Sequence, residues 1–203
     1  MPKTTFFKLT EQKQDSLIAA AMQEFAKATF EEVKIASIIK SAGIPRSSFY
    51  DYFEDKEDVY LYLLSMIKEQ KQLYMAPLLD KESSPFFDSL REFIKAGALF
   101  AAHYPLYEKI AKSFYANTQL MQTLLGEDRP NMISLYEELL LEGIASGELA
   151  PDLDAPYMAE CIYQLTTGLT AGYDKETDQD ISEMIAEKSE KLISLLEKGI
   201  AYS

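Results

Sequence analysis

The most constraining feature of the sequence is a helix, a tight turn and a second helix within residues 38–57, IIKSAGIPRSSFYDYFEDKE. Apolar residues with the spacing of one helical face occur at Ile35, Ile38, Ile39 and Ala42. Gly43 then stands where a helix commonly ends with a residue in the left-handed conformation. Pro45 suits the first position of the next helix, where a missing N–H group costs no hydrogen bond. The segment therefore predicts two short helices joined by a tight turn.

The second of these helices combines an apolar face with a polar face. Phe49 and Phe53 are spaced so that both can anchor the helix to a core. The polar side chains on a different arc are Arg46, Ser47, Tyr50 and Asp51. A short helix that is held by aromatic residues and exposes a polar arc has the features of a major-groove reader. The motif therefore predicts DNA binding, with Arg46 as the donor to a guanine base.

Regular apolar spacing extends the motif in both directions. The upstream helix is indicated by Ile18, Ala21, Met22 and Phe25, and the downstream helix by Val59, Tyr62, Leu63, Met66 and Ile67. We expect a three-helix head over residues 10–53. A connecting helix should follow over residues 55–76, and Pro77 should end or kink it.

The remainder of the sequence predicts helices and no strand. We expect these helices over residues 86–104, 106–116, 131–145, 156–173 and 180–201, with a linker at residues 147–154. The expected fold class is therefore all-α, in which a small helix-turn-helix head precedes a larger helical body.

Three runs of residues resemble the N-terminal domain of TetR-type transcriptional regulators. They are LIAAAMQEFA at 17–26, IIKSAGI at 38–44 and FYDYFEDKE at 49–57. Residues 143–154 resemble, more weakly, the linker that precedes the first dimerisation helix in many members of this family. The resemblance implies a DNA-binding domain at residues 1–54 and a ligand-binding and dimerisation domain at residues 55–203.

The resemblance and the polar arc together imply a set of DNA contacts. We expect groove contacts from Arg46, Ser47, Tyr50 and Asp51, phosphate contacts from Ser48, Tyr52 and Lys56, and further residues of the interface at Lys34 and Ser37. Three positions depart from the family pattern. Lys34 stands where a Thr is usual, and Thr29 stands where a Gly is common. Pro45 stands where Ser or Thr is common, which removes a side-chain cap and a possible backbone donor to phosphate from the second helix.

The net charge of −13 is unevenly distributed along the chain. Residues 1–56 contain eight basic and eight acidic side chains, so the whole excess of negative charge lies in residues 57–203. A neutral head attracts phosphate groups only weakly. We therefore expect DNA affinity to rest on a few well-placed contacts and on dimerisation.

The helix expected at residues 156–173 is apolar on two sides, so it needs two partners. Gly168 and Gly172, four residues apart, would let a partner approach closely. The pattern alone leaves open a helix pair buried within one chain, but the family resemblance implies a four-helix dimer interface. The residues expected there are Ile162, Leu165, Gly168, Leu169, Gly172, Ile185, Leu192 and Leu196.

The middle helices are rich in aromatic residues and Met, which suits a cavity for a lipophilic molecule. The candidate lining residues are Phe93, Phe100, His103, Tyr104, Tyr107, Met132 and Tyr136. The alternative is a solid core, because aromatic residues at helical spacing usually serve packing. His103 could likewise have a purely structural role.

No sequence pattern indicates an enzyme, a cofactor or a metal site. The chain has a single His and no glycine-rich phosphate-binding loop. It has no apolar run long enough to cross a membrane and no secretory apolar segment, so we expect a cytoplasmic protein. We predict a homodimeric repressor that a lipophilic small molecule releases from operator DNA. The alternative is a DNA-associated or adaptor protein on the same scaffold that binds no small molecule.

Overall fold

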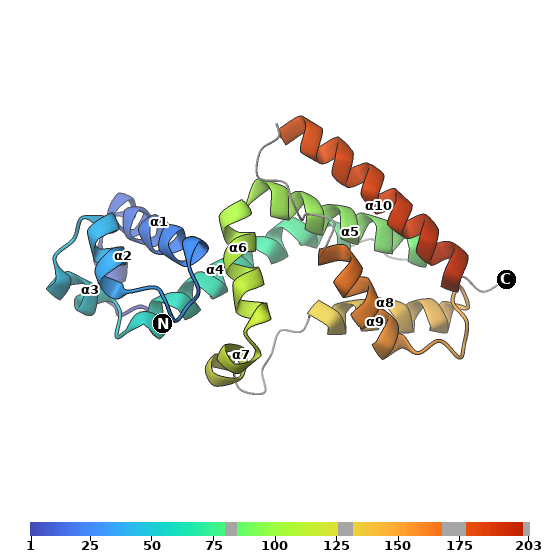
Figure 1. Ribbon diagram of the computed structural model, residues 1–203, viewed down its shortest axis with the longest axis horizontal. Coiled ribbons are helices and arrows are strands. Elements are labelled where there is room, and N and C mark those ends of the chain that lie inside the picture. The colour runs from blue at the N-terminus through green and yellow to red at the C-terminus, as the bar shows by residue number, and fades with distance from the viewer. Residues whose placement is uncertain (80–84, 126–131, 168–177, 201–203) are drawn as a thin grey trace. The chain divides into compact units, whose positions relative to one another are not determined.

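The computed structural model describes residues 1–79, 85–125, 132–167 and 178–200 (Figure 1). Within these residues the chain forms ten α-helices and one short 3-10 helix, and it contains no β-strand. The all-α prediction is confirmed. The chain divides into two compact units, one made of Met1–Lys71 and Tyr104–Arg129, the other of Gln72–His103 and Pro130–Ser203.

The predicted helix-turn-helix is present in the first unit. It consists of α1 (Glu11–Lys27), α2 (Ile35–Ala42) and α3 (Arg46–Tyr52). Gly43 ends α2 in the left-handed conformation, with φ of 65°, as predicted. Pro45 lies one position earlier than predicted, at the N-cap, because its ψ of 150° is extended and α3 begins only at Arg46.

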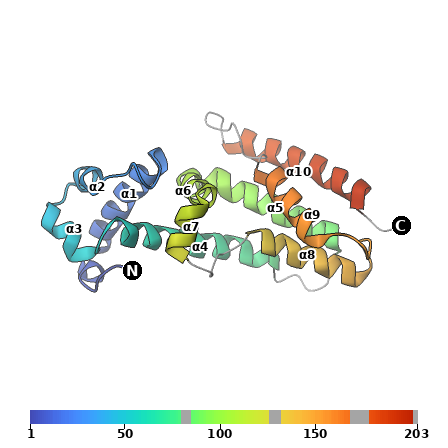
Figure 2. The same ribbon diagram turned by 60° about the horizontal axis from the view of Figure 1, so that its bottom comes forward.

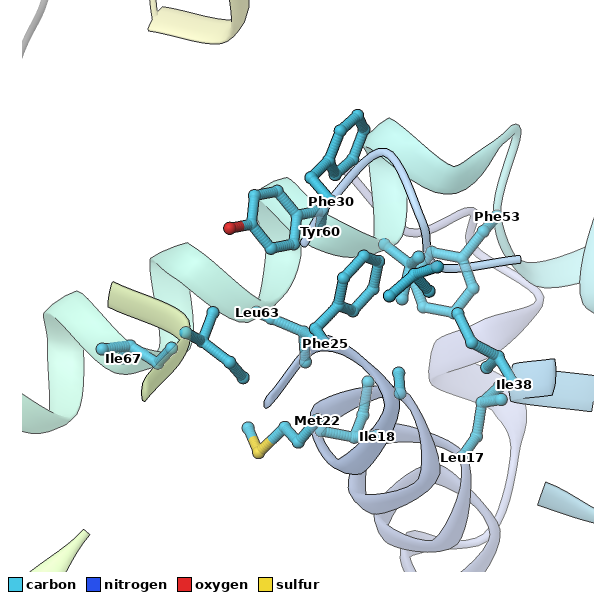
Figure 3. Packing of buried hydrophobic residues seen from close by; sticks show 14 of the residues in the cluster. Leu17, Ile18, Met22, Phe25, Phe30, Ile38, Phe53, Tyr60, Leu63 and Ile67 are labelled. Atoms are coloured by element: carbon cyan, nitrogen blue, oxygen red, sulfur yellow. The ribbon is translucent and has the colours of Figure 1, made fainter. Parts of the chain in front are cut away.

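Aromatic packing fills the core of the first unit. Phe25, Phe30 and Tyr60 lie against one another, with ring centroids 4.7–6.2 Å apart (Figure 3). Phe49 and Phe53, the two anchors of α3, are completely buried in the same cluster. The orientation predicted for α3 is therefore confirmed.

The connecting helix α4 runs from Lys56 to Leu79. The prediction that it ends at residue 76 is wrong, because the helix continues past Pro77. A proline removes one backbone hydrogen bond, directed at the carbonyl four residues earlier. Pro77 lies in the last turn of α4, where few residues remain to be disturbed.

Two later helices complete the core of the first unit. They are α6 (Pro105–Ala116) and α7 (Thr118–Leu125), and α7 was not predicted from the sequence. Ile110 and Phe114 of α6 and Leu120 of α7 are buried in the cluster that also holds α1, α2 and α3. The predicted division at residue 54 assigned both helices to the body, whereas the structure packs them with the helix-turn-helix.

The second unit contains α5 (Phe86–His103), α8 (Met132–Ser146), α9 (Ala155–Thr167) and α10 (Asp178–Ile200). Helix α8 packs on α9, and α10 lies along α5 (Figure 2). Gly143 allows close packing, since a Cβ atom there would come within 2.8 Å of both Phe86 and Leu149. Gly147, with φ of 82°, lies directly after α8 and starts the predicted linker.

The loop between α1 and α2 is held by side chains from two other parts of the first unit, the start of α4 and the residue before α7. The Lys56 ammonium group donates hydrogen bonds to the carbonyl oxygens of Phe30 and Glu31, at 2.6 and 3.3 Å, and lies 4.3 Å from the centre of the Phe30 ring. Asn117 Nδ2 donates to the Glu31 carboxylate at 2.9 Å, while Asn117 Oδ1 accepts from the Leu120 N–H and caps α7. This loop leads directly into α2, so these contacts set the entry to the helix-turn-helix.

We expect Lys56→Met to lower the free energy of unfolding by about 1–2 kcal/mol, because it removes both charged hydrogen bonds to the loop and keeps most of the apolar stem. Urea denaturation of the DNA-free protein measures the effect. Lys13→Met, at an exposed position of α1, removes the same charge and serves as the control. Equal stability of the two variants would show that Lys56 does not hold the loop.

Candidate nucleic-acid interface

Helix α3 presents a polar surface above its buried aromatic anchors. Arg46, Ser47, Tyr50 and Asp51 are all exposed, as predicted from their arc. The Tyr50 ring packs edge-on against the Phe49 ring, with centroids 5.4 Å apart, so part of its surface is fixed to the core beneath. The arc offers one guanidinium group, one carboxylate and two hydroxyl groups, which are the donors and acceptors that read base edges. Their contact with bases stays a prediction.

The other residues predicted to contact DNA lie in different surroundings. Ser48 and Tyr52 are half-buried, and the Tyr52 ring packs near Phe6 with a centroid distance of 6.4 Å. Lys34 is exposed at the N-cap of α2, and Ser37 is half-buried one turn further on. The Lys56 ammonium group is directed at the loop carbonyls described above. The phosphate contacts of Ser48, Tyr52 and Lys56 and the DNA contacts of Lys34 and Ser37 stay predictions.

The structure adds an N-terminal segment, residues 2–9, that sequence reasoning did not connect with α3. Its short 3-10 helix, η1 (Phe6–Lys8), buries Phe6 completely. The Phe6 ring lies 5.3 Å from the Phe53 ring and 5.7 Å from the Tyr62 ring. Two adjacent Phe residues in an otherwise polar stretch were the available signal that this segment is part of the head.

The residues predicted to line a ligand cavity are divided between the two units. In the second unit, Phe93 and Tyr136 are buried edge-to-face at 5.3 Å. The Tyr136 hydroxyl donates to Thr166 Oγ1 at 3.2 Å, and burial raises its pKa to about 12. This hydroxyl is therefore a neutral polar group within an apolar cluster.

The other candidate lining residues differ in exposure. Phe100 is buried against Tyr74, and the Tyr74 hydroxyl lies 3.1 Å from Nδ1 of the exposed His103. Tyr104 and Tyr107 belong to the first unit, where their rings stack at 5.4 Å. The side chain of Met132 lies outside the described residues. The cavity itself stays a prediction.

The residues predicted for the dimer interface also fall into groups. Ile162, Leu192 and Leu196 are buried in the core of the second unit, so the chain itself covers them. Leu165 is 46% exposed. Gly168, Leu169 and Gly172 lie outside the described residues, as does the side chain of Ile185.

Helices α9 and α10 expose further large apolar side chains that the prediction omitted. Tyr157 is 62% exposed and Leu195 is 63% exposed. They alternate with buried positions of the same helices, because Tyr157 lies two positions from the buried Ala159 and Leu195 lies next to the buried Leu196. Among the described residues of α9 and α10, the exposed large apolar side chains are therefore Tyr157, Leu165 and Leu195.

The described parts of the chain contain neither a candidate metal site nor a candidate membrane span. There, no three His, Cys, Asp or Glu side chains come together as a metal site would require. No helix among those residues combines the length and the apolar character needed to cross a membrane.

Comparison with known proteins places these features in a family. Residues 17–63 match the model of the bacterial regulatory proteins of the tetR family. The structure is similar to that of a TetR family transcriptional regulator from Chloroflexus aurantiacus J-10-FL, with a TM-score of 0.83 and 30% identity over 100% of both chains.

Two curated relatives from Bacillus subtilis (strain 168) are more distant. The uncharacterized HTH-type transcriptional regulator YdgC is 25% identical, covering 90% of this chain and 92% of the relative. The fatty acid metabolism regulator protein is also 25% identical, covering 72% of this chain and 76% of the relative. Since the Chloroflexus protein matches over its whole length and the N-terminal model matches the helix-turn-helix, the chain belongs to the TetR family of DNA-binding transcriptional regulators.

Proposed function

We propose that this regulator is a homodimeric repressor that reads its operator with α3 and leaves it when a lipophilic molecule binds the body. It would act in the cytoplasm, on operator DNA. The observation that carries the proposal is the construction of α3. Two buried Phe residues hold a seven-residue helix whose exposed arc carries Arg46, Ser47, Tyr50 and Asp51. In a dimer, two such helices would enter successive major grooves about 34–36 Å apart.

Arg46→Ala should weaken operator binding by about 1–3 kcal/mol and relax selectivity at one base pair, because a guanidinium group can bind guanine with two hydrogen bonds. The probe is a duplex selected from random sequences by the purified protein, and the measurement is fluorescence anisotropy. Arg46→Lys is the matched control for charge, since it keeps the positive charge and loses the bidentate hydrogen-bonding geometry of the guanidinium group. An Arg46→Ala variant that binds the selected duplex as tightly as the original protein would contradict the assignment.

Dimerisation is proposed through the exposed apolar side chains of α9 and α10. Tyr157, Leu165 and Leu195 are each between 46% and 63% exposed in the single chain. Both helices that carry them also pack within the second unit, and exposed apolar side chains on such helices are candidates for an interface if they form one patch. A dimer would also let one protein engage two half-sites together, which raises affinity without any new DNA contact.

Leu165→Glu and Leu195→Glu should each shift the protein toward monomer, because a carboxylate buried in an apolar interface costs more than about 2 kcal/mol. Analytical ultracentrifugation measures the oligomeric state. Leu141→Glu is the matched control, since Leu141 is 51% exposed on α8. If both interface variants dimerise as well as the control, the interface lies elsewhere.

The proposed ligand site centres on Tyr136 in the second unit. Its hydroxyl group and that of Thr166 form a polar pair next to Phe93, within an apolar cluster. An apolar ligand that carries one polar group could exchange hydrogen bonds with this pair. The relative that regulates fatty acid metabolism makes a fatty acid a reasonable first probe.

The covalent chain offers a route from this unit to the DNA-binding head. Helix α5 of the second unit ends at His103, and α6 of the first unit begins at Pro105. Ile110 and Phe114 of α6 are buried in the core that holds α3. A ligand would release DNA only to the extent that it binds the released state more tightly than the DNA-bound state.

Dodecanoic acid should release the selected duplex, and Tyr136→Phe should require a higher acid concentration while binding DNA unchanged. The expected shift corresponds to about 1 kcal/mol, the net value of one hydrogen bond. Tyr62→Phe, which removes a hydroxyl group from α4 in the first unit, is the matched control. No release at any concentration would exclude fatty acids as effectors, and an equal response from both variants would exclude Tyr136. The alternative function, a DNA-associated or adaptor protein without a ligand, would then be preferred.

A further inference from the structure

The last carbonyl groups of helix α3 have no hydrogen-bond donor within the helix. The helix has seven residues and is followed by Phe53 in an extended conformation, with φ of −129° and ψ of 150°. The Phe53 N–H donates to the carbonyl of Phe49 at 2.9 Å. The last carbonyl groups of a helix have no partner within it, and an isolated helix this short is not stable in water. The carbonyl groups of Tyr50, Asp51 and Tyr52 therefore need donors from elsewhere.

The N-terminal segment supplies a donor for each of these three carbonyl groups. The Lys3 ammonium group donates to Tyr50 O at 2.9 Å, and the Lys3 backbone N–H donates to Tyr52 O at 2.8 Å. The Thr5 hydroxyl group donates to Asp51 O. Two residues from the start of the chain thus complete the end of a helix that lies more than 40 positions later.

The segment that carries these donors is itself held in place. Pro2 and Phe6 are both buried, on either side of Lys3 and Thr5 in the sequence. The Phe6 N–H donates to Lys3 O at 2.9 Å and closes a turn around Thr5. Anchored donors lose little conformational freedom when they bond, so they can hold the end of α3 in one orientation.

We propose that Lys3 and Thr5 are positioning residues for DNA reading, which set the orientation of α3 through its last three carbonyl groups. This inference rests on the proposed role of α3. Base contacts need groups placed within about 0.5 Å, and a seven-residue helix that can tilt does not meet that requirement. Pro2 and Phe6 serve the fold by burial, whereas Lys3 and Thr5 are exposed and donate to the backbone of α3.

The first test is hydrogen exchange of the α3 amides in the DNA-free protein. Thr5→Val keeps the shape of the side chain and removes the donor, while Thr5→Ser keeps the hydroxyl group. The matched control is Thr4→Val, at the exposed neighbouring residue. We expect amide exchange at the end of α3 to be about two- to tenfold faster in Thr5→Val and unchanged in Thr5→Ser and Thr4→Val.

The second test compares the selected duplex with random DNA. Thr5→Val should lower affinity for the selected duplex about two- to tenfold and leave random DNA unchanged, because a tilted helix still meets phosphate but misses base edges. Lys3→Met should lower affinity for the selected duplex in the same way. It should also weaken binding to both kinds of DNA, because one positive charge is lost. The control is Lys8→Met, at an exposed lysine of the same segment. It removes one positive charge but no hydrogen-bond donor to α3.

The outcomes separate this inference from the proposed function. Suppose that Arg46→Ala weakens operator binding. If Thr5→Val and Thr5→Ser then show the same amide hydrogen exchange and the same ratio of affinities for selected and random DNA, the positioning role is overturned. Equal effects of Lys3→Met and Lys8→Met on both kinds of DNA would show that Lys3 acts only through its charge. That result would also overturn the positioning role. If Arg46→Ala has no effect, the reading role of α3 fails first, and the exchange measurement still decides whether the segment holds that helix.

Discussion

The burial of Phe49 and Phe53 beneath α3 is the interaction on which the DNA-binding head depends. A helix of seven residues has too few internal hydrogen bonds to persist by itself, so tertiary packing must hold it. Both rings are fully buried, and the cluster around them receives side chains from α1, α2, α4, α6 and α7. A change in that cluster can therefore alter the position of α3. This is why the head includes helices that come much later in the chain.

Local patterns predicted the parts of the head that local interactions determine. The spacing of apolar residues located α1, α2 and α3, and Gly43 marked the turn because a positive φ strongly favours glycine. The contacts of the N-terminal segment could not be found in this way. Lys3 and Thr5 bond to backbone carbonyl groups, which every residue has, so no side-chain pattern identifies the partner. The packing of α6 and α7 on the head is also a long-range choice that periodicity does not reveal.

The second unit shows a different limit of sequence reasoning. The pattern showed that α9 and α10 are apolar, but an apolar side chain does not indicate which surface will cover it. Ile162, Leu192 and Leu196 are covered by the chain itself, whereas Leu165 and Leu195 remain exposed. Two adjacent residues of α10, Leu195 and Leu196, thus have different environments. Only the three-dimensional packing distinguishes a core position from a surface that a second copy could cover.

The charge distribution explains why geometry should matter so much in this head. Residues 1–56 have no net charge, so long-range attraction to DNA is weak, and the acidic remainder of the chain opposes it. Lys56, one of the eight basic residues, already bonds to loop carbonyl groups. With little general attraction, we expect affinity to come from contacts that form only when α3 is correctly oriented. Buried aromatic rings beneath the helix and backbone donors at its end meet that need, since both restrict its orientation without adding charge.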